Sequence, residues 1–286
     1  MLITMFLLGL VYAVLVGALI AAGTGAETIA LVAGIMFLVQ FFASDKIALA
    51  SMGARVISRE QAPELFGIVE RLCLTANVPM PRVAIAQTPM PNAFAVGRSP
   101  KSATICVTTG ILQLLSPGEL EGVLGHELTH VINRDVMVMT LASFFASIAA
   151  FITQMGFWFG GGFGGGRRNN NDMSFIAVIG ISAVVYMISF ILLQALSRYR
   201  EFAADRGSAI ITGRPSALIS ALYKISGRMQ QIPTRDLRAA NGELAAFYIF
   251  PPRVKRGIST IFSTHPSLEA RVERLQRLEA QLQGTR

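Results

Sequence analysis

Charged residues are scarce in this sequence. Asp, Glu, Lys and Arg make up 15% of its 286 residues, whereas hydrophobic residues make up 52%. A soluble domain carries about 25% charged residues, so this composition excludes an ordinary soluble protein. We therefore expect the surplus of apolar residues to lie in lipid.

Cysteine is also rare, with only Cys73 and Cys106 in the chain. The two are not spaced as a metal-binding pair, and both lie in apolar surroundings within a segment that we assign below to the cytoplasm. Thiols in the cytoplasm stay reduced, so no disulfide is expected. The default interpretation is that both are small buried hydrophobic residues.

Stacking aromatic residues are missing from the basic parts of the chain. The net charge is +8, and the basic residues gather towards the C-terminus and beside the apolar stretches. Nucleic-acid sites interleave basic residues with aromatic ones, so this pattern does not favour nucleic acid as a partner. Anionic lipid headgroups are the expected partner instead.

Four long apolar stretches account for the hydrophobic surplus. They span residues 1–22, 28–43, 136–159 and 175–196, and each has about the length that a helix needs to cross a bilayer. The first has no basic residues before it, so we expect a retained anchor rather than a signal peptide. The stretches predict two transmembrane hairpins, at 1–43 and 136–196, the second with a glycine-rich extracytoplasmic loop. The polar segments 44–135 and 197–286 are expected to form one domain.

Charge predicts the side of the membrane on which this domain lies. An even number of crossings places both polar segments and both termini on one side. The loops on the opposite side carry only Arg167 and Arg168, whereas the ends of the stretches on the domain side carry Lys46, Arg55, Arg59, Arg134, Arg198, Arg200, Arg206 and Arg214. Because basic residues mark the cytoplasmic side, we predict a multi-pass protein of the cytoplasmic (inner) membrane with a cytoplasmic domain.

Local patterns predict a helix, a small sheet and then further helices in the polar segments. Apolar residues recur at helical spacing over 61–76, and short β-rich runs follow at 82–86, 93–96 and 104–108. Ser116, Pro117 and Glu119 are the signals of a helix start, and we expect this helix to continue through Ile132 into the third crossing. Later helices are expected at 198–211, 216–229 and 266–282.

The segment His126-Glu127-Leu128-Thr129-His130 lies on this helix. Residues four apart share one face of a helix, so the two imidazoles can bind one ion. Glu127 lies about 100° round the helix from His126, where its carboxylate can reach a metal-bound water rather than the metal. The alternative is two histidines on a solvated helix face.

A catalytic zinc ion needs a third protein ligand and an open fourth position. Glu201 is the natural candidate, because it lies on the helix that leaves the fourth crossing, at the same membrane depth as the histidines. Asp205 follows one turn later and could orient a zinc-binding histidine. Taken alone, two acidic residues at this spacing are more often a solvated acidic face.

The third histidine, His265, precedes Pro266 and the last predicted helix. Its functional interpretation is a donor or cation that stabilises the tetrahedral oxyanion during hydrolysis. The alternative is a packing residue at a helix entry.

Together these motifs resemble the HtpX-type membrane metalloproteases, gluzincins related to the CAAX prenyl proteases. The resemblance rests on the segments 126–130, 201–205, 92–94 and 265–266 and covers nearly the whole chain. It implies a mainly α-helical protein with a small β-sheet: four transmembrane helices and a cytoplasmic zincin-like α+β domain. It also implies one Zn²⁺ held by His126, His130 and Glu201, with Glu127 as the catalytic base.

The resemblance further implies how substrates bind. Asn92 and Ala93 would belong to an edge strand that pairs with an extended polypeptide, whereas the sequence alone favours a turn residue for Asn92. The implied substrates are misfolded or damaged membrane proteins, cleaved in quality control and stress response.

Three other functions fit parts of the pattern. A site-2-type intramembrane protease carries its zinc motif inside a crossing, but charged residues flank the motif here. A CAAX-type processing peptidase would need more crossings to enclose its substrate. A zinc-binding scaffold or transporter would need ionisable residues inside its crossings, and these crossings offer only Ser, Thr and Gln.

Overall fold

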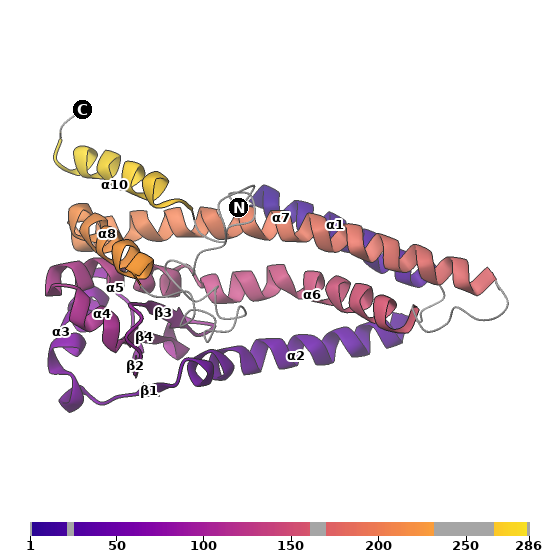
Figure 1. The fold of residues 1–286 in the computed structure, drawn as a ribbon, viewed down its shortest axis with the longest axis horizontal. Helices are drawn as coiled ribbons and strands as arrows, with labels where there is room; N and C mark the ends of the chain where they lie inside the picture. The colour runs from indigo at the N-terminus through magenta and orange to yellow at the C-terminus, as the bar shows by residue number, and fades with distance from the viewer. Residues whose placement is uncertain (1, 22–25, 161–169, 232–265, 285–286) are drawn as a thin grey trace. The chain divides into compact units, whose positions relative to one another are not determined.

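The computed structural model describes residues 2–21, 26–160, 170–231 and 266–284 (Figure 1). The chain divides into two compact units. The first comprises Met1–Ser44 and Val138–Leu196, and the second comprises Asp45–Met137 and Ser197–Arg286. As expected, the protein is mainly helical with one small mixed sheet.

The described residues of the first unit form four helices. Three of these continue past the unit's boundaries into the sequence of the second unit. They are α1 (Leu2–Ala21), α2 (Ala26–Ser51), α6 (Asp135–Gly160) and α7 (Asn170–Thr212). Leu8, Leu15 and Ala149 belong to its core. The Tyr12 hydroxyl donates a hydrogen bond of 2.5 Å to the Ala142 carbonyl, as polar groups inside an apolar bundle require a partner.

Three helical segments in the described residues are long and apolar enough to cross a membrane. They are Ile3–Ala21, Asp135–Thr153 and Ile176–Thr212. Helix α2 is not among the candidates found in the part of the chain that the structure describes. The predicted count of four crossings stays a prediction.

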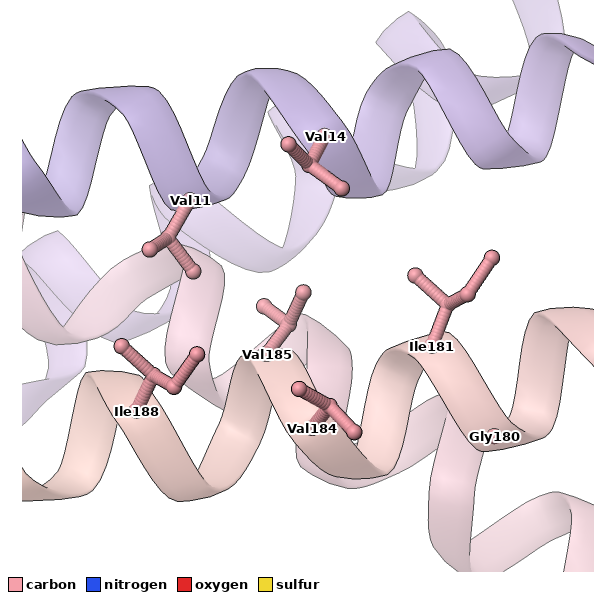
Figure 2. Close-up of a pocket in the computed structure, with 7 residues that line it drawn as sticks. All are labelled: Val11, Val14, Gly180, Ile181, Val184, Val185 and Ile188. Carbon is pink, nitrogen blue, oxygen red and sulfur yellow. The ribbon is translucent and has the colours of Figure 1, made fainter.

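A groove of about 310 Å³ lies between α1 and α7 (Figure 2). Its lining is aliphatic throughout, with a glycine that leaves space beside the helix: Val11, Val14, Gly180, Ile181, Val184, Val185 and Ile188. Such a surface suits lipid hydrocarbon and offers no side-chain hydrogen bond to a polar ligand.

The sheet of the second unit has the order β1-β2-β4-β3. Strands β2 (Arg82–Ala86), β3 (Ala93–Val96) and β4 (Thr104–Thr108) have the predicted bounds, whereas β1 (Ala54–Val56) was not predicted. β2 and β4 are parallel, and the other two pairs are antiparallel. β3 is therefore an edge strand of the sheet.

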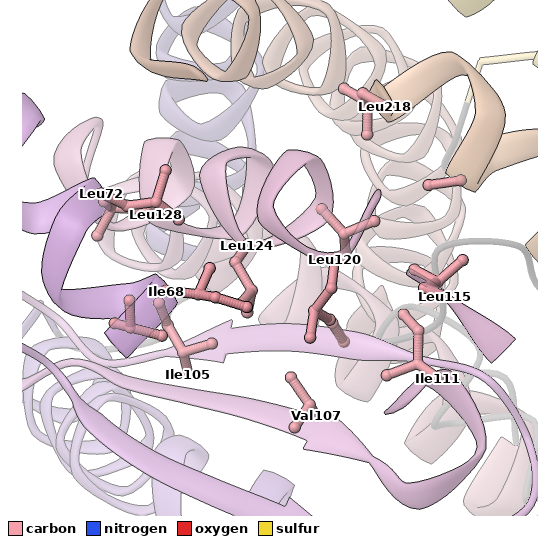
Figure 3. Packing of buried hydrophobic residues seen from close by; sticks show 14 of the residues in the cluster. Ile68, Leu72, Ile105, Val107, Ile111, Leu115, Leu120, Leu124, Leu128 and Leu218 are labelled. Atoms are coloured by element: carbon pink, nitrogen blue, oxygen red, sulfur yellow. The ribbon is translucent and has the colours of Figure 1, made fainter. Parts of the chain in front are cut away.

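Helices cover this sheet and share one apolar core with it. They are α3 (Pro63–Ala76), α4 (Thr109–Leu114), α5 (Pro117–Ile132), α8 (Pro215–Gln231) and α10 (Leu268–Leu282), with short 3-10 turns at Arg59–Gln61 and Pro100–Ser102. Leu120, Leu124 and Leu128 form one stripe of α5 and pack towards Ile105 and Val107 of β4 (Figure 3). The opposite side of α5 is thereby left for its histidines.

Helix α5 begins where the sequence predicts but ends earlier. The Ser116 hydroxyl accepts the Glu119 N–H, and the Glu119 carboxylate accepts the Ser116 N–H. The expected continuation into the third crossing is wrong, because α5 ends at Ile132 and α6 begins at Asp135. Between them Arg134 has a φ of 54°, a left-handed conformation that breaks the helix.

The Glu119 carboxylate also joins α5 to α8. It accepts hydrogen bonds from the Ser220 hydroxyl at 2.6 Å and from Lys224 Nζ at 2.8 Å. Burial alone would raise its pKa, but the donors of Lys224, Ser220 and Ser116 outweigh burial and hold the pKa of Glu119 at about 2. Glu119 therefore both caps the start of α5 and connects α5 to α8.

We predict that Glu119→Gln lowers the stability of the protein at neutral pH. The folded pKa lies below the unfolded value of about 4.3, so the carboxylate stabilises the fold above that pH and loses its effect as the pH falls towards 2. We expect a loss of about 1–3 kcal/mol at pH 7 that shrinks below about pH 4, measured by thermal unfolding in detergent.

Glu273→Gln is the matched control. Glu273 pairs with Arg277 on the surface of α10, with 63% of its side chain exposed, so little change is expected. Equal effects of both variants at every pH would contradict the prediction.

Candidate metal centre

His126 and His130 lie one turn apart on α5 and direct their Nε2 atoms towards each other. The two atoms are 3.2 Å apart, and the ring planes are perpendicular. The side chains are 4% and 11% exposed. The solvated helix face considered above is therefore excluded.

Glu201 reaches this pair from α7. Its Oε2 lies 3.7 Å from His126 Nε2, and its Oε1 lies 3.5 Å from His130 Nε2. A tetrahedral zinc ion with bonds of about 2.0–2.1 Å separates its ligand atoms by about 3.3 Å. The three side chains form a possible metal-binding group, and their spacing fits such an ion.

Small residues let α5 and α7 approach closely enough for this group to form. A Cβ atom on Gly207 would lie 2.3 Å from Thr129 Cγ2, and one on Gly125 would lie 3.1 Å from Ser208 Oγ. The Ser208 hydroxyl donates to the Gly122 carbonyl at 2.7 Å. Glycine is therefore needed at position 207, and Gly125 lies in a tight contact on the facing helix.

Asp205 lies one turn after Glu201 and contacts His126. Its Oδ1 is 3.0 Å from His126 Nδ1. Arg271 of α10 binds the same carboxylate through both oxygens, with Nη2 at 2.6 Å from Oδ1 and Nε at 2.9 Å from Oδ2. Arg271 is 1% exposed, and its Nη1 lies 3.7 Å from Glu201 Oε2.

Asp135 contacts His130 as Asp205 contacts His126. Its Oδ2 lies 2.6 Å from His130 Nδ1. Its Oδ1 lies 3.2 Å from Nε of Arg200, the residue before Glu201. Each histidine therefore has a carboxylate at Nδ1 and an arginine behind that carboxylate.

The buried charges shift the pKa values of the site. Burial alone would lower the pKa of His130, but Asp135 and Glu201 raise it to about 10 in the metal-free protein. Asp205 and Glu201 likewise raise the pKa of His126 against burial. Burial raises the pKa of Glu127, while the two histidines oppose that shift.

Glu127 lies between the two histidines in sequence and is 5% exposed. The site thus combines a possible metal-binding group with a carboxylate that burial biases towards the protonated form. That combination suits proton transfer beside a metal ion.

The remaining predicted residues lie on β3, directly before it or outside the described chain. Asn92 is fully buried: its N–H donates to Thr108 Oγ1, and its carbonyl accepts the Thr108 N–H. Bonding alternates along antiparallel strands, so the N–H and C=O groups of Ala93 and Ala95 point away from β4. His265 lies outside the described residues.

Sequence reasoning did not assign Arg271, Asp135 or Arg200 to the site. Arg271 had a signal, because it occupies a position between Leu268 and Leu275 on the apolar side of an amphipathic helix. An arginine at such a position needs a buried acidic partner. Asp135 and Arg200 carried no comparable signal, because charged residues are expected at the ends of crossings.

Comparison with known proteins identifies the family. A model of the family described as "Peptidase family M48" matches residues 59–279. The chain belongs to peptidase family M48.

The relatives of this M48 peptidase match over nearly their whole length. "Protease HtpX homolog" of Moorella thermoacetica is 53% identical over all of this chain and 95% of its own length. "Protease HtpX homolog 1" of Streptomyces coelicolor is 49% identical over 98% of this chain and 92% of its own length. The resemblance to HtpX-type proteases is confirmed: the chain is a metalloprotease, and its apolar helices make it a membrane protein.

A solved structure shares the fold of this M48 peptidase. The crystal structure of S. mikatae Ste24p matches with a TM-score of 0.58 at 16% identity, over 93% of this chain and 62% of that one. At this identity the match shows a common fold only.

We predict that Gly207→Ala lowers metal content and cleavage together. The added methyl group overlaps Thr129, so α7 must move away from α5 and carry Glu201 with it. We expect a loss of about 1–3 kcal/mol of stability, measured by thermal unfolding, with zinc per chain measured by elemental analysis.

Gly227→Ala is the control, because its Cβ would have no neighbour within 4 Å. It should leave metal content unchanged and be neutral or slightly stabilising. Thr129→Ala should restore part of the metal content of Gly207→Ala. A Gly207→Ala variant with wild-type metal content would contradict the prediction.

Proposed function

We propose that this M48 peptidase is a zinc-dependent endopeptidase in which His126, His130 and Glu201 hold one zinc ion. The observation that carries the proposal is the spacing of 3.2–3.7 Å between the two imidazole Nε2 atoms and from each of them to the Glu201 carboxylate oxygen that faces it. Two imidazoles and one carboxylate leave the fourth position of a catalytic zinc site open. The alternative, a zinc-binding scaffold that does not hydrolyse peptides, is not favoured, because the chain belongs to a family of peptidases.

Glu127 is the proposed general base. A zinc ion in this position supplies Lewis acidity to the attacking water and to the scissile carbonyl. The Glu127 carboxylate takes the proton of that water and delivers it to the leaving amine. Burial raises the pKa of Glu127, and this direction suits a group that first accepts and then donates a proton.

Asp205 and Arg271 keep His126 in place for the metal. The Asp205 carboxylate accepts a hydrogen bond from Nδ1–H of His126, so that the lone pair of Nε2 is directed towards the ion. Arg271 balances the charge of Asp205 and lies beside Glu201. His265 remains a predicted stabiliser of the oxyanion.

The substrate is proposed to pair with the edge strand β3. The backbone N–H and C=O groups of Ala93 and Ala95 that point away from β4 would bond to an extended polypeptide and so read its backbone rather than its side chains. Ala93 is 1% exposed, so this pairing requires the outer edge of β3 to be uncovered. Asn92 is buried directly before β3, and its N–H donates a hydrogen bond to Thr108 Oγ1 at the end of β4. A protease that reads backbone can accept many unfolded sequences.

The proposed substrates are misfolded or damaged membrane proteins, cleaved at the cytoplasmic surface of the inner membrane. Charge near the apolar stretches supports this orientation. Four crossings and contact with anionic lipid headgroups belong to the same proposal. α5 is not among the candidate membrane spans of the described residues, which favours cleavage outside the bilayer over intramembrane cleavage.

We predict that Glu127→Gln keeps zinc but loses cleavage, because Gln cannot take the proton. The loss should be at least about 100-fold in kcat, measured on an unfolded protein substrate with and without chelator. His126→Ala, His130→Ala and Glu201→Ala should instead lose bound zinc, measured by elemental analysis. An active, zinc-replete Glu127→Gln enzyme would refute the role of the base.

We further predict that cleavage depends on the backbone amide of every second substrate residue. Each substrate residue that pairs with Ala93 or Ala95 uses its amide, whereas the residue between them points its amide away. N-methylation of a model peptide at successive positions should therefore slow cleavage at alternate positions only. A peptide N-methylated far from the scissile bond is the control, and uniform tolerance at all positions would exclude β-pairing.

A further inference from the structure

His130 contacts a carboxylate from outside its own helix. Asp135 Oδ2 lies 2.6 Å from His130 Nδ1, and the Asp135 side chain is 5% exposed. The contact mirrors that of Asp205 with His126 at 3.0 Å. The two imidazoles therefore have equivalent partners on the nitrogen that faces away from the candidate metal position.

The break between α5 and α6 makes this contact possible. In an uninterrupted helix the fifth residue after His130 would lie about 140° round the axis, away from the imidazole. Arg134, at a φ of 54°, turns the chain so that Asp135 meets His130. The left-handed conformation is unfavourable for a residue other than glycine, and the contact that it allows offers a reason why arginine adopts it here.

Arg200 completes the arrangement from α7. Its Nε lies 3.2 Å from the other oxygen of Asp135, without an aligned hydrogen bond. Glu201, the next residue, faces His126 and His130. Consecutive residues of α7 thus contact the carboxylate behind His130 and the metal-facing side of both histidines.

We propose that Asp135 is a positioning residue of the metal site, held by Arg200, which fixes His130 with Nδ1–H towards Asp135 and the Nε2 lone pair towards the ion. A carboxylate at this place selects the tautomer, orients the ring and makes Nε2 a stronger ligand. This inference rests on the proposed zinc site and adds a residue to it.

The test is the zinc affinity of Asp135→Asn in the full chain in detergent. Titration against a chromophoric chelator should show a zinc Kd raised by about 10–100-fold. The d–d absorption bands of the cobalt(II)-loaded protein should also shift, because the ligand field of His130 changes. Neither readout depends on cleavage.

Asp45→Asn is the matched control. Asp45 is also an aspartate at the end of an apolar segment, 15% exposed and paired at 3.7 Å with Arg98 of the segment after β3. It should leave the zinc Kd and the cobalt spectrum at their wild-type values. Equal losses in both variants would overturn the proposal, and so would wild-type affinity in Asp135→Asn.

A double-mutant cycle tests the role of Arg200. Arg200→Ala should raise the zinc Kd less than Asp135→Asn does, and it should add little in the Asp135→Asn background, because it acts through that carboxylate. Full additivity would overturn this part. If Asp135→Asn does not fold, the zinc Kd of Arg200→Ala decides alone: an unchanged value overturns the proposal.

The zinc affinity of His126→Ala distinguishes an error in the proposed zinc site from an error in the role of Asp135. If His126→Ala keeps wild-type zinc affinity, the proposed metal site is wrong. If His126→Ala loses zinc but Asp135→Asn binds it as wild type does, only the positioning role is wrong.

Discussion

The approach of α7 to α5 is the contact on which the candidate site depends. Two histidines on one helix supply two ligands, and the third must come from a second helix close enough for its carboxylate to reach both imidazoles. Glycines at 125 and 207 allow that distance, since a methyl group at Gly207 would overlap Thr129. The close approach of the two backbones therefore lets the Glu201 carboxylate reach both imidazoles.

Charge balance is the second constraint. The site buries Glu127, Glu201, Asp205, Asp135 and Arg271, and isolated buried charges are costly. The arginines offset this cost by pairing with the carboxylates behind the histidines. Helix α10 closes the site by supplying Arg271 from near the C-terminus, which gives the last described helix a part in the metal centre.

Much of the fold could be predicted because its signals are local. The three strands from Arg82 to Thr108 follow from β-rich runs separated by turn residues, and the start of α5 follows from the hydroxyl cap at Ser116. The end of α5 could not be predicted, because residues 131–136 continue a helical pattern and Arg134 adopts a conformation that arginine disfavours. Strand β1 was missed because three residues carry too little periodicity.

The sequence by itself indicated the family, the apolar helices and the candidate metal-binding side chains. Helical spacing places His126 and His130 on one face of a helix whatever surrounds them. The tertiary structure decided which charges complete the site. Asp135 follows the helix break after α5, and Arg200 follows the second apolar hairpin. Arg271 lies on the last described helix. Only the folded chain brings them together, since no local spacing encodes contacts between separate elements.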